Sequence, residues 1–153
     1  MTISKNLKAF LDMIAFSEGT VAVAGSDNGY NVIVGNNLFH DYSDHPRQFI
    51  YIRRIKAKSS AAGRYQLLAR YFDAYKEQLN LPDFSPDSQD AIAIQQIREC
   101  KALNDIDAGN FETAVSKCRK IWASLPNAGY GQHENTIENL KLAYKKAGGT
   151  ISV

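Results

Sequence analysis

The helical spacing of apolar residues breaks off between Val21 and Ala62 and is present on both sides of this segment. No other feature of the sequence limits the possible folds as much. Before the break, apolar residues recur at positions i, i+3, i+4 and i+7 of a helix: Leu7, Phe10, Leu11 and Ile14. Ser4 or Asn6 is available as the N-cap. The pattern predicts a first helix with one face in a core.

Within the break, glycine and asparagine recur too often for a helix, as at Gly25, Asn28-Gly29 and Gly35. Two short runs there, Asn31 to Val34 and Phe49 to Ile52, are rich in β-branched and aromatic residues. These runs predict a small lobe that contains strands.

Beyond the break the helical period returns, first in a stripe formed by Tyr65, Leu68, Phe72, Tyr75 and Leu79. This second helix should end near Asn80-Leu81-Pro82. A third begins with Ser85 as N-cap and Pro86 as the first helical residue. Its stretch Ala91 to Cys100 is apolar on most of its circumference, which predicts a place in the core.

Two more helices are expected toward the end of the sequence. Asn110 can cap a fourth, which should stop before Pro126 and whose stripe is Phe111, Ala114, Val115, Cys118 and Trp122. A last helix should stop at Gly148-Gly149 and carries Ile137, Leu140 and Tyr144. The predicted fold class is α+β, a mostly helical body with a small β lobe after the first helix.

Length and composition favour one globular domain over residues 1–153, because 44% of the 153 residues are hydrophobic and 22% are charged. No membrane span is visible, and Met1 to Lys8 lacks the pattern of an export signal, so we expect synthesis in the cytoplasm. Cys100 and Cys118, the only cysteines, are expected to be reduced packing residues. They could pair if the protein met an oxidising compartment.

The net charge is only +2, but no Asp or Glu occurs between His45 and Phe72. This basic region contains Arg47, Arg53, Arg54, Lys56, Lys58, Arg64 and Arg70. It is either a solvated surface or a surface that attracts an anionic polymer, and charge alone does not distinguish nucleic acid from a carboxylate-bearing wall polymer.

One carboxylic acid, Glu18 in Ser17-Glu18-Gly19, follows the apolar stripe of the first helix by one turn. Such a position is either a solvated residue before a glycine cap or a general acid at the rim of a core. Two glycine-bearing segments are either plain turns or places where a sugar could be contacted. They are Ala62 to Gln66, where Gln66 is both donor and acceptor, and Ala128 to Gln132, where Tyr130 lies between two glycines.

Several ungapped strings resemble the bacteriophage lambda endolysin family, in order from about residue 8 to Gly149. They are Ala9 to Met13, Ser17 to Thr20, Val32 to Gly35, Asp41 to Arg47, Gly63 to Leu68 and Ile121 to Pro126. The resemblance implies a lysozyme-like catalytic domain and a murein lytic transglycosylase. The chain departs from the family pattern at Val21 to Asn28, where Asp27-Asn28 stands in place of an expected histidine. It also departs at Phe16 and Tyr71-Phe72, where relatives often carry tryptophans.

The resemblance further implies that Glu18 is the catalytic residue, and that Tyr65, Gln66, Tyr130 and Gln132 bind the substrate. Arg53 to Lys58 and Ala128 to His133 would be two mobile lips of the cleft. The implied partner is the glycan of peptidoglycan, without nucleic acid, stable membrane association or a cofactor, and the implied protein is a monomer. It would act on the periplasmic wall after the membrane is permeabilised.

Two other classes of function remain as alternatives. A hydrolytic muramidase needs a second carboxylate, for which Asp27, Asp41 and Asp44 are candidates. A non-catalytic module could bind the cell wall or nucleic acid through the basic region. A metal site is not expected, because the spacing of the candidate ligands fits no zinc signature: His40, Asp41, Asp44 and His45.

Overall fold

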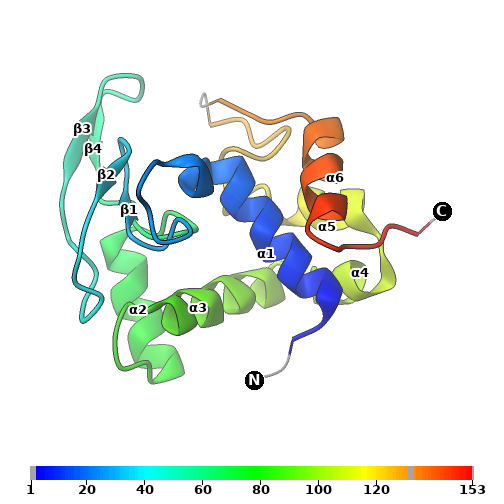
Figure 1. Cartoon of the computed structure of the whole chain (residues 1–153), viewed down its shortest axis with the longest axis horizontal. Helices are drawn as coiled ribbons and strands as arrows, with labels where there is room; N and C mark the ends of the chain where they lie inside the picture. The colour runs from blue at the N-terminus through cyan, green and yellow to red at the C-terminus, as the bar shows by residue number, and fades with distance from the viewer. Residues whose placement is uncertain (1–2, 131–132, 153) are drawn as a thin grey trace. The chain divides into compact units, whose positions relative to one another are not determined.

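The computed structural model describes residues 3–130 and 133–152. The chain divides into two compact units, one formed by the residues up to Ser17 and from Ile94 onward, the other by Glu18–Ala93. Figure 1 labels the helices and strands in chain order. No helix among the described residues is long and apolar enough to cross a bilayer.

The first helix is α1, Lys5–Glu18, as the apolar spacing predicts. Ser4 is the N-cap, because its Oγ accepts a hydrogen bond from the Leu7 N–H at 3.0 Å. The buried face of α1 includes Phe10, whose ring makes edge contacts with Phe111 and Tyr144. These three rings form a core of the first unit, to which α1, α5 (Phe111–Cys118) and α6 (Ile137–Lys146) each contribute one aromatic residue.

Two short hairpins confirm the predicted strand-containing lobe in the second unit. A 3-10 turn, η1 (Thr20–Ala22), precedes them. β1 (Val32–Ile33) pairs antiparallel with β2 (Asn37–Leu38), and β3 (Ile50–Ile52) with β4 (Ala57–Ser59). The predicted runs correspond to β1 and β3. Isolated bridges from Ile33 to Ala62 and from Ala62 to Leu67 extend the pairing to the segment before α2.

The helix α2 runs over Ala69–Leu79 and therefore begins later than the spacing of Tyr65 and Leu68 predicts. Residues 62–67 form a tight turn in which the Ala62 and Leu67 N–H groups each donate to the other residue's carbonyl. Gln66 has a φ of 53°, a left-handed conformation that interrupts a helix. The helix ends as predicted, with Asn80 left-handed at its C-cap.

The third predicted helix is α3, Pro86–Glu99, capped by the Ser85 hydroxyl, which accepts from the Ser88 N–H. The prediction missed α4, Leu103–Ala108, a short helix that ends at the left-handed Gly109. It also extended α5 too far, because α5 ends at Cys118 and Trp122 lies in the turns that follow. The last helix, α6, was placed correctly, and Thr136 caps it.

A core of the second unit packs beneath the hairpins and contains the aromatic pair Phe72 and Phe84, both 0% exposed. Their ring centroids are 5.0 Å apart in an edge arrangement. His45 also belongs to this core, with its ring centroid 4.9 Å from that of Phe84. The lobe of short strands is therefore held by packing against α2 and α3 rather than by long ladders.

We predict that Phe72→Ala lowers the free energy of unfolding by about 3–5 kcal/mol, because it removes a fully buried ring and leaves a cavity. Tyr71→Ala on the same helix is the matched control; Tyr71 is 46% exposed, and its removal should cost no more than about 0.5 kcal/mol. Urea unfolding measures both. Equal losses in the two variants would contradict the assignment of the core.

Candidate active site

Glu18 is the last residue of α1 and is half-buried. Gly19 follows with a φ of 80°, the left-handed conformation that ends the helix. Apart from Gly19 and its two chain neighbours, no residue that the structure describes has an atom within 4 Å of where a Gly19 side chain would begin. Gly19 lines a hollow of about 380 Å³, together with Ala22, Val23, Ala24 and Asn36. A half-buried carboxylic acid thus stands at a rigid helix end, next to an open hollow.

Both neighbours of this Glu18-Gly19 pair are anchored by side-chain hydrogen bonds. Ser17 shares a hydrogen bond of 2.8 Å with the Ser124 hydroxyl, and Asn135 donates to the Ser17 carbonyl at 3.0 Å. Thr20 is 2% exposed, and its hydroxyl donates to the Arg64 carbonyl at 2.7 Å. The backbone that carries Glu18 is therefore held on both sides.

The turn 62–67 receives the Thr20 bond and is itself built on a buried polar network. Arg64 is 4% exposed and donates through Nε to the Asn28 carbonyl at 2.9 Å and through Nη1 to the Tyr65 hydroxyl at 3.1 Å. Its guanidinium also lies over the rings of Tyr30 and Tyr65. These contacts compensate a charge that would otherwise be costly to bury.

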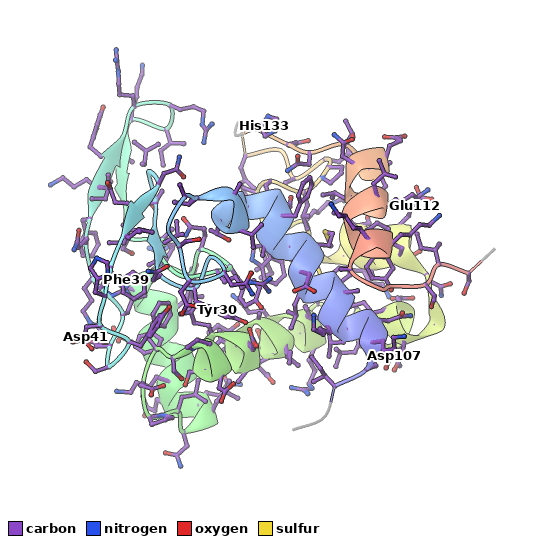
Figure 2. All side chains as sticks on the ribbon, in the orientation of Figure 1. Tyr30, Phe39, Asp41, Asp107, Glu112 and His133 are labelled. Carbon is purple, nitrogen blue, oxygen red and sulfur yellow. The ribbon has the colours of Figure 1, made fainter. Side chains whose placement is uncertain are left out.

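Asp90 on α3 receives the other end of this network. The Tyr65 hydroxyl donates to Oδ1 at 2.6 Å and the Tyr30 hydroxyl at 2.9 Å; Figure 2 shows Tyr30 between the hairpins and α3. Burial raises the pKa of Asp90, while the two tyrosine hydroxyls and the Arg64 charge oppose the rise. Burial, followed by the charge of Asp90, raises the pKa of Tyr30 to about 12.

The predicted substrate-binding residues differ in exposure. Tyr65 is 5% exposed with its hydroxyl on Asp90, a position that supports the turn. Gln66 is partly exposed, and its Nε2 donates to the carbonyls of Gly63 and Val32. Tyr130 is 54% exposed, with its hydroxyl on the Lys120 carbonyl. Gln132 lies outside the described residues. The binding roles of all four stay predictions.

The loop before Tyr130 is organised by a carboxylate that sequence reasoning missed. Glu134 accepts the N–H of Asn127 at 2.8 Å and that of Gly129 at 3.1 Å. These two bonds hold the pKa of Glu134 below its usual range. No spacing rule of helices or strands predicts this contact within the loop. The contacts of Ser124, Asn135 and Asp90 could not be predicted either, because their partners lie far away in the chain.

The basic region is smaller at the surface than the sequence indicates. Arg64 is buried, and the exposed Arg47 pairs with Asp44 at 2.8 Å and with Asp73 at 2.6 Å. The exposed cations concentrate in the β3–β4 hairpin at Arg53, Arg54, Lys56 and Lys58. Tyr51 on β3 and Phe49 directly before this strand are 57% and 61% exposed.

His45, one of the residues considered as metal ligands, has another role. His45 is 2% exposed; its Nε2 bonds the Leu67 carbonyl and its Nδ1 accepts the Arg47 N–H. Burial lowers the pKa of His45, so the ring is neutral at neutral pH. Across residues 3–130 and 133–152, no three His, Cys, Asp or Glu side chains are grouped in a way that could hold a metal ion.

Comparison with known proteins identifies the family. The family model described as Endolysin matches residues 8–151, nearly the whole chain. The chain belongs to the endolysin family. The endolysin of Escherichia phage lambda is 54% identical over 151 residues, which cover 97% of this chain and 95% of the relative. The endolysin of Escherichia phage P2 is 52% identical over 155 residues, with coverages of 95% and 94%.

Solved structures confirm the lysozyme-like α+β fold of this endolysin. The bacteriophage lambda lysozyme complexed with a chitohexasaccharide matches with a TM-score of 0.95 at 53% identity, over 99% of each chain. A second structure of a lysozyme from bacteriophage lambda matches with a TM-score of 0.91 at 52% identity, also over 99% of each chain. The chain is therefore a phage-type endolysin, an enzyme.

We predict that Tyr65→Phe destabilises the endolysin by about 1–3 kcal/mol, because it removes a hydroxyl that Asp90 and Arg64 both use. The loss should grow as the pH rises through the pKa of Asp90. The Tyr65 bond lowers that pKa, so its removal penalises the ionised carboxylate and leaves the protonated one nearly unaffected. Thermal unfolding between acidic and neutral pH measures the effect.

Tyr51→Phe, which removes a hydroxyl from an exposed ring, is the matched control and should show no pH-dependent loss. A loss in Tyr65→Phe that is the same at every pH would contradict the network around Asp90. Tyr65→Phe also tests the predicted contact of the Tyr65 hydroxyl with a sugar. A raised KM in the folded variant would support this contact, and an unchanged KM would exclude it.

Proposed function

We propose that this endolysin is a peptidoglycan lytic transglycosylase that uses Glu18 as its only catalytic carboxyl group. It cleaves the bond between N-acetylmuramic acid and N-acetylglucosamine and leaves a 1,6-anhydro ring on the muramic acid. The observation that carries the proposal is Glu18 itself, a half-buried carboxyl group at the rigid end of α1 in a chain of this family.

In the proposed reaction Glu18 first acts as a general acid and protonates the glycosidic oxygen as the bond to C1 breaks. The resulting carboxylate then accepts the proton of the muramic acid 6-hydroxyl, which attacks C1 of its own sugar. No water enters the product. The N-acetyl group assists by stabilising the positive charge at C1, so the protein supplies placement and one tuned acid.

The other candidate carboxylates, Asp27, Asp41 and Asp44, each bond to a neighbouring residue, which supports a mechanism with one acid. A hydrolytic muramidase would need a second group beside the scissile bond. Asp44 is paired with Arg47, whose hydrogen bond lowers the Asp44 pKa. Asp41 accepts the Ser43 N–H at 2.8 Å. Asp27 accepts the Tyr42 hydroxyl at 2.7 Å. Each of the three has a contact that stabilises the local backbone or lobe.

The proposed partner is the glycan strand of peptidoglycan, bound by a monomer without a cofactor. The related lambda lysozyme has been solved with a chitohexasaccharide, a glycan that shares the β-linked N-acetylglucosamine unit. We further propose that the enzyme reaches the periplasmic wall across a membrane that another agent has permeabilised. Tyr130 and the β3–β4 hairpin are proposed to contact the glycan, the first by stacking and the second by charge.

We predict that Glu18→Gln lowers kcat by a factor of at least about 10²–10⁴. The amide keeps the shape of the side chain but does not protonate the leaving oxygen. The melting temperature of the variant, measured alongside, should stay close to that of the wild type. The assay is the release of soluble fragments from purified peptidoglycan. Near-normal turnover in Glu18→Gln would refute the assignment of the acid.

Asp27→Asn is the matched control for this experiment, since it makes the same change from acid to amide elsewhere in the second unit. The proposed mechanism expects it to retain activity. A muramidase that used Asp27 as its second carboxylate would lose activity in this variant as in Glu18→Gln. Asp41→Asn and Asp44→Asn extend the same test to the other two candidates.

We also predict that cleavage depends on salt through the β3–β4 hairpin. If its cations hold an anionic polymer, high ionic strength should raise KM more than it lowers kcat. A variant with glutamine at four hairpin positions should show the same change at low salt: Arg53, Arg54, Lys56 and Lys58. A control of equal charge change replaces four exposed lysines outside the hairpin: Lys5, Lys101, Lys145 and Lys146. Equal kinetics in the two variants would leave the hairpin without a role in binding.

A further inference from the structure

The two cysteines, which the proposed reaction does not use, lie next to each other in the unit formed by the chain's two ends. Cys100 is the first residue after α3, and Cys118 is the last residue of α5. They are 6% and 0% exposed, and both are free thiols. The Cys118 thiol is placed to donate a hydrogen bond to the Cys100 thiol, so the two side chains face each other within hydrogen-bonding range.

Contacts on the neighbouring residues hold this arrangement independently of the sulfur atoms. Lys117 donates through Nζ to the Lys101 carbonyl at 3.3 Å and to the Asp105 carboxylate at 2.5 Å. The residue before Cys118 is thus tied to the residue after Cys100. The Cys100 N–H donates to the Gln96 carbonyl at 3.0 Å, which continues the helical bonding of α3 through the cysteine.

The two thiols differ in acidity. The hydrogen bond from Cys118 and the nearby charge of Lys120 lower the pKa of Cys100 against the effect of burial. The same hydrogen bond, together with burial, raises the pKa of Cys118. Cys100 is therefore the thiol that forms the thiolate, the species that attacks a disulfide.

We propose that Cys100 and Cys118 form a reversible intramolecular disulfide when the protein meets an oxidant of the disulfide class. The Cys100 thiolate attacks one sulfur of the oxidant, forms a mixed disulfide and expels the first thiolate. Cys118 then loses its proton and attacks the Cys100 sulfur, which expels the second thiolate. Two cysteine thiols are oxidised, the oxidant disulfide is reduced to two thiols, and the two protons pass to those thiols.

The cross-link would close the short segment that contains α4 and α5 and would restrict the unfolded chain. Beyond Cys118, the N–H groups of Ile121 and Trp122 both donate to the Cys118 carbonyl. The chain then reaches Ser124, whose hydroxyl contacts Ser17 at 2.8 Å. Oxidation would therefore stabilise the segment that anchors the residue before Glu18. If the proposed function holds, this occurs outside the cytoplasmic membrane, where disulfides persist.

The test equilibrates the reduced, folded full-length protein with mixtures of oxidised and reduced glutathione, followed by acid quenching. We expect a monomer that has lost two hydrogen atoms in mass. Tryptic digestion without reductant should yield the peptide Glu99–Lys101 linked to Cys118–Arg119. The melting temperature of the oxidised protein should exceed that of the reduced protein by on the order of 5–10 °C.

Cys100→Ser is the control variant, because it removes the thiolate-forming partner and keeps the fully buried Cys118. Its melting temperature should not respond to the glutathione ratio. The comparison of oxidised with reduced wild type stands by itself if this variant does not fold. Two free thiols after equilibration under native conditions, a disulfide only between chains or only in denaturant, or equal stability of the two forms would overturn the proposal. None of these measurements depends on enzymatic activity, so their failure is distinct from failure of the proposed function.

Discussion

The burial of Arg64 in a hydrogen-bonded network that ends on Asp90 is the interaction on which the order of the second unit depends. A guanidinium that is 4% exposed must be compensated, and Tyr30, Tyr65 and the Asn28 carbonyl provide the compensation. The network locks the turn 62–67, and the carbonyl of Arg64 in turn accepts the Thr20 hydroxyl. Because Thr20 lies two residues after Glu18, the position of the proposed acid depends on this buried network.

This arrangement suits a reaction in which one carboxyl group acts first as a general acid and then as a general base. A general acid that later serves as a base must stay in place while its proton leaves and returns. Glu18 is carried by the end of a helix, between Ser17 with its bonds to Ser124 and Asn135 and Thr20 with its bond to Arg64. Gly19 is the left-handed residue that ends the helix after Glu18. It also lines the hollow that Ala22, Val23, Ala24 and Asn36 share.

Much of the fold could be predicted from the sequence because its signals are local. The apolar spacing of α1, the Ser85-Pro86 start of α3 and the final glycines each act within a turn of helix. The late start of α2 could not be predicted, because the helical spacing of Tyr65 is overridden by its bond to Asp90. The resemblance identified the family, and it predicts Glu18 as the catalytic residue. The contacts that position the turn and the loop, through Asp90 and Glu134, have no local signature.

Whether one acid cleaves the glycan without water as the nucleophile can be read from the origin of the oxygen in the product. Peptidoglycan is digested in water enriched in heavy oxygen, and the masses of the released fragments are measured by mass spectrometry. We expect anhydromuramic ends that contain no heavy oxygen and are lighter than hydrolytic ends by one water. Reducing muramic acid ends that carry the heavy oxygen would show that water is the nucleophile and would refute the proposed mechanism.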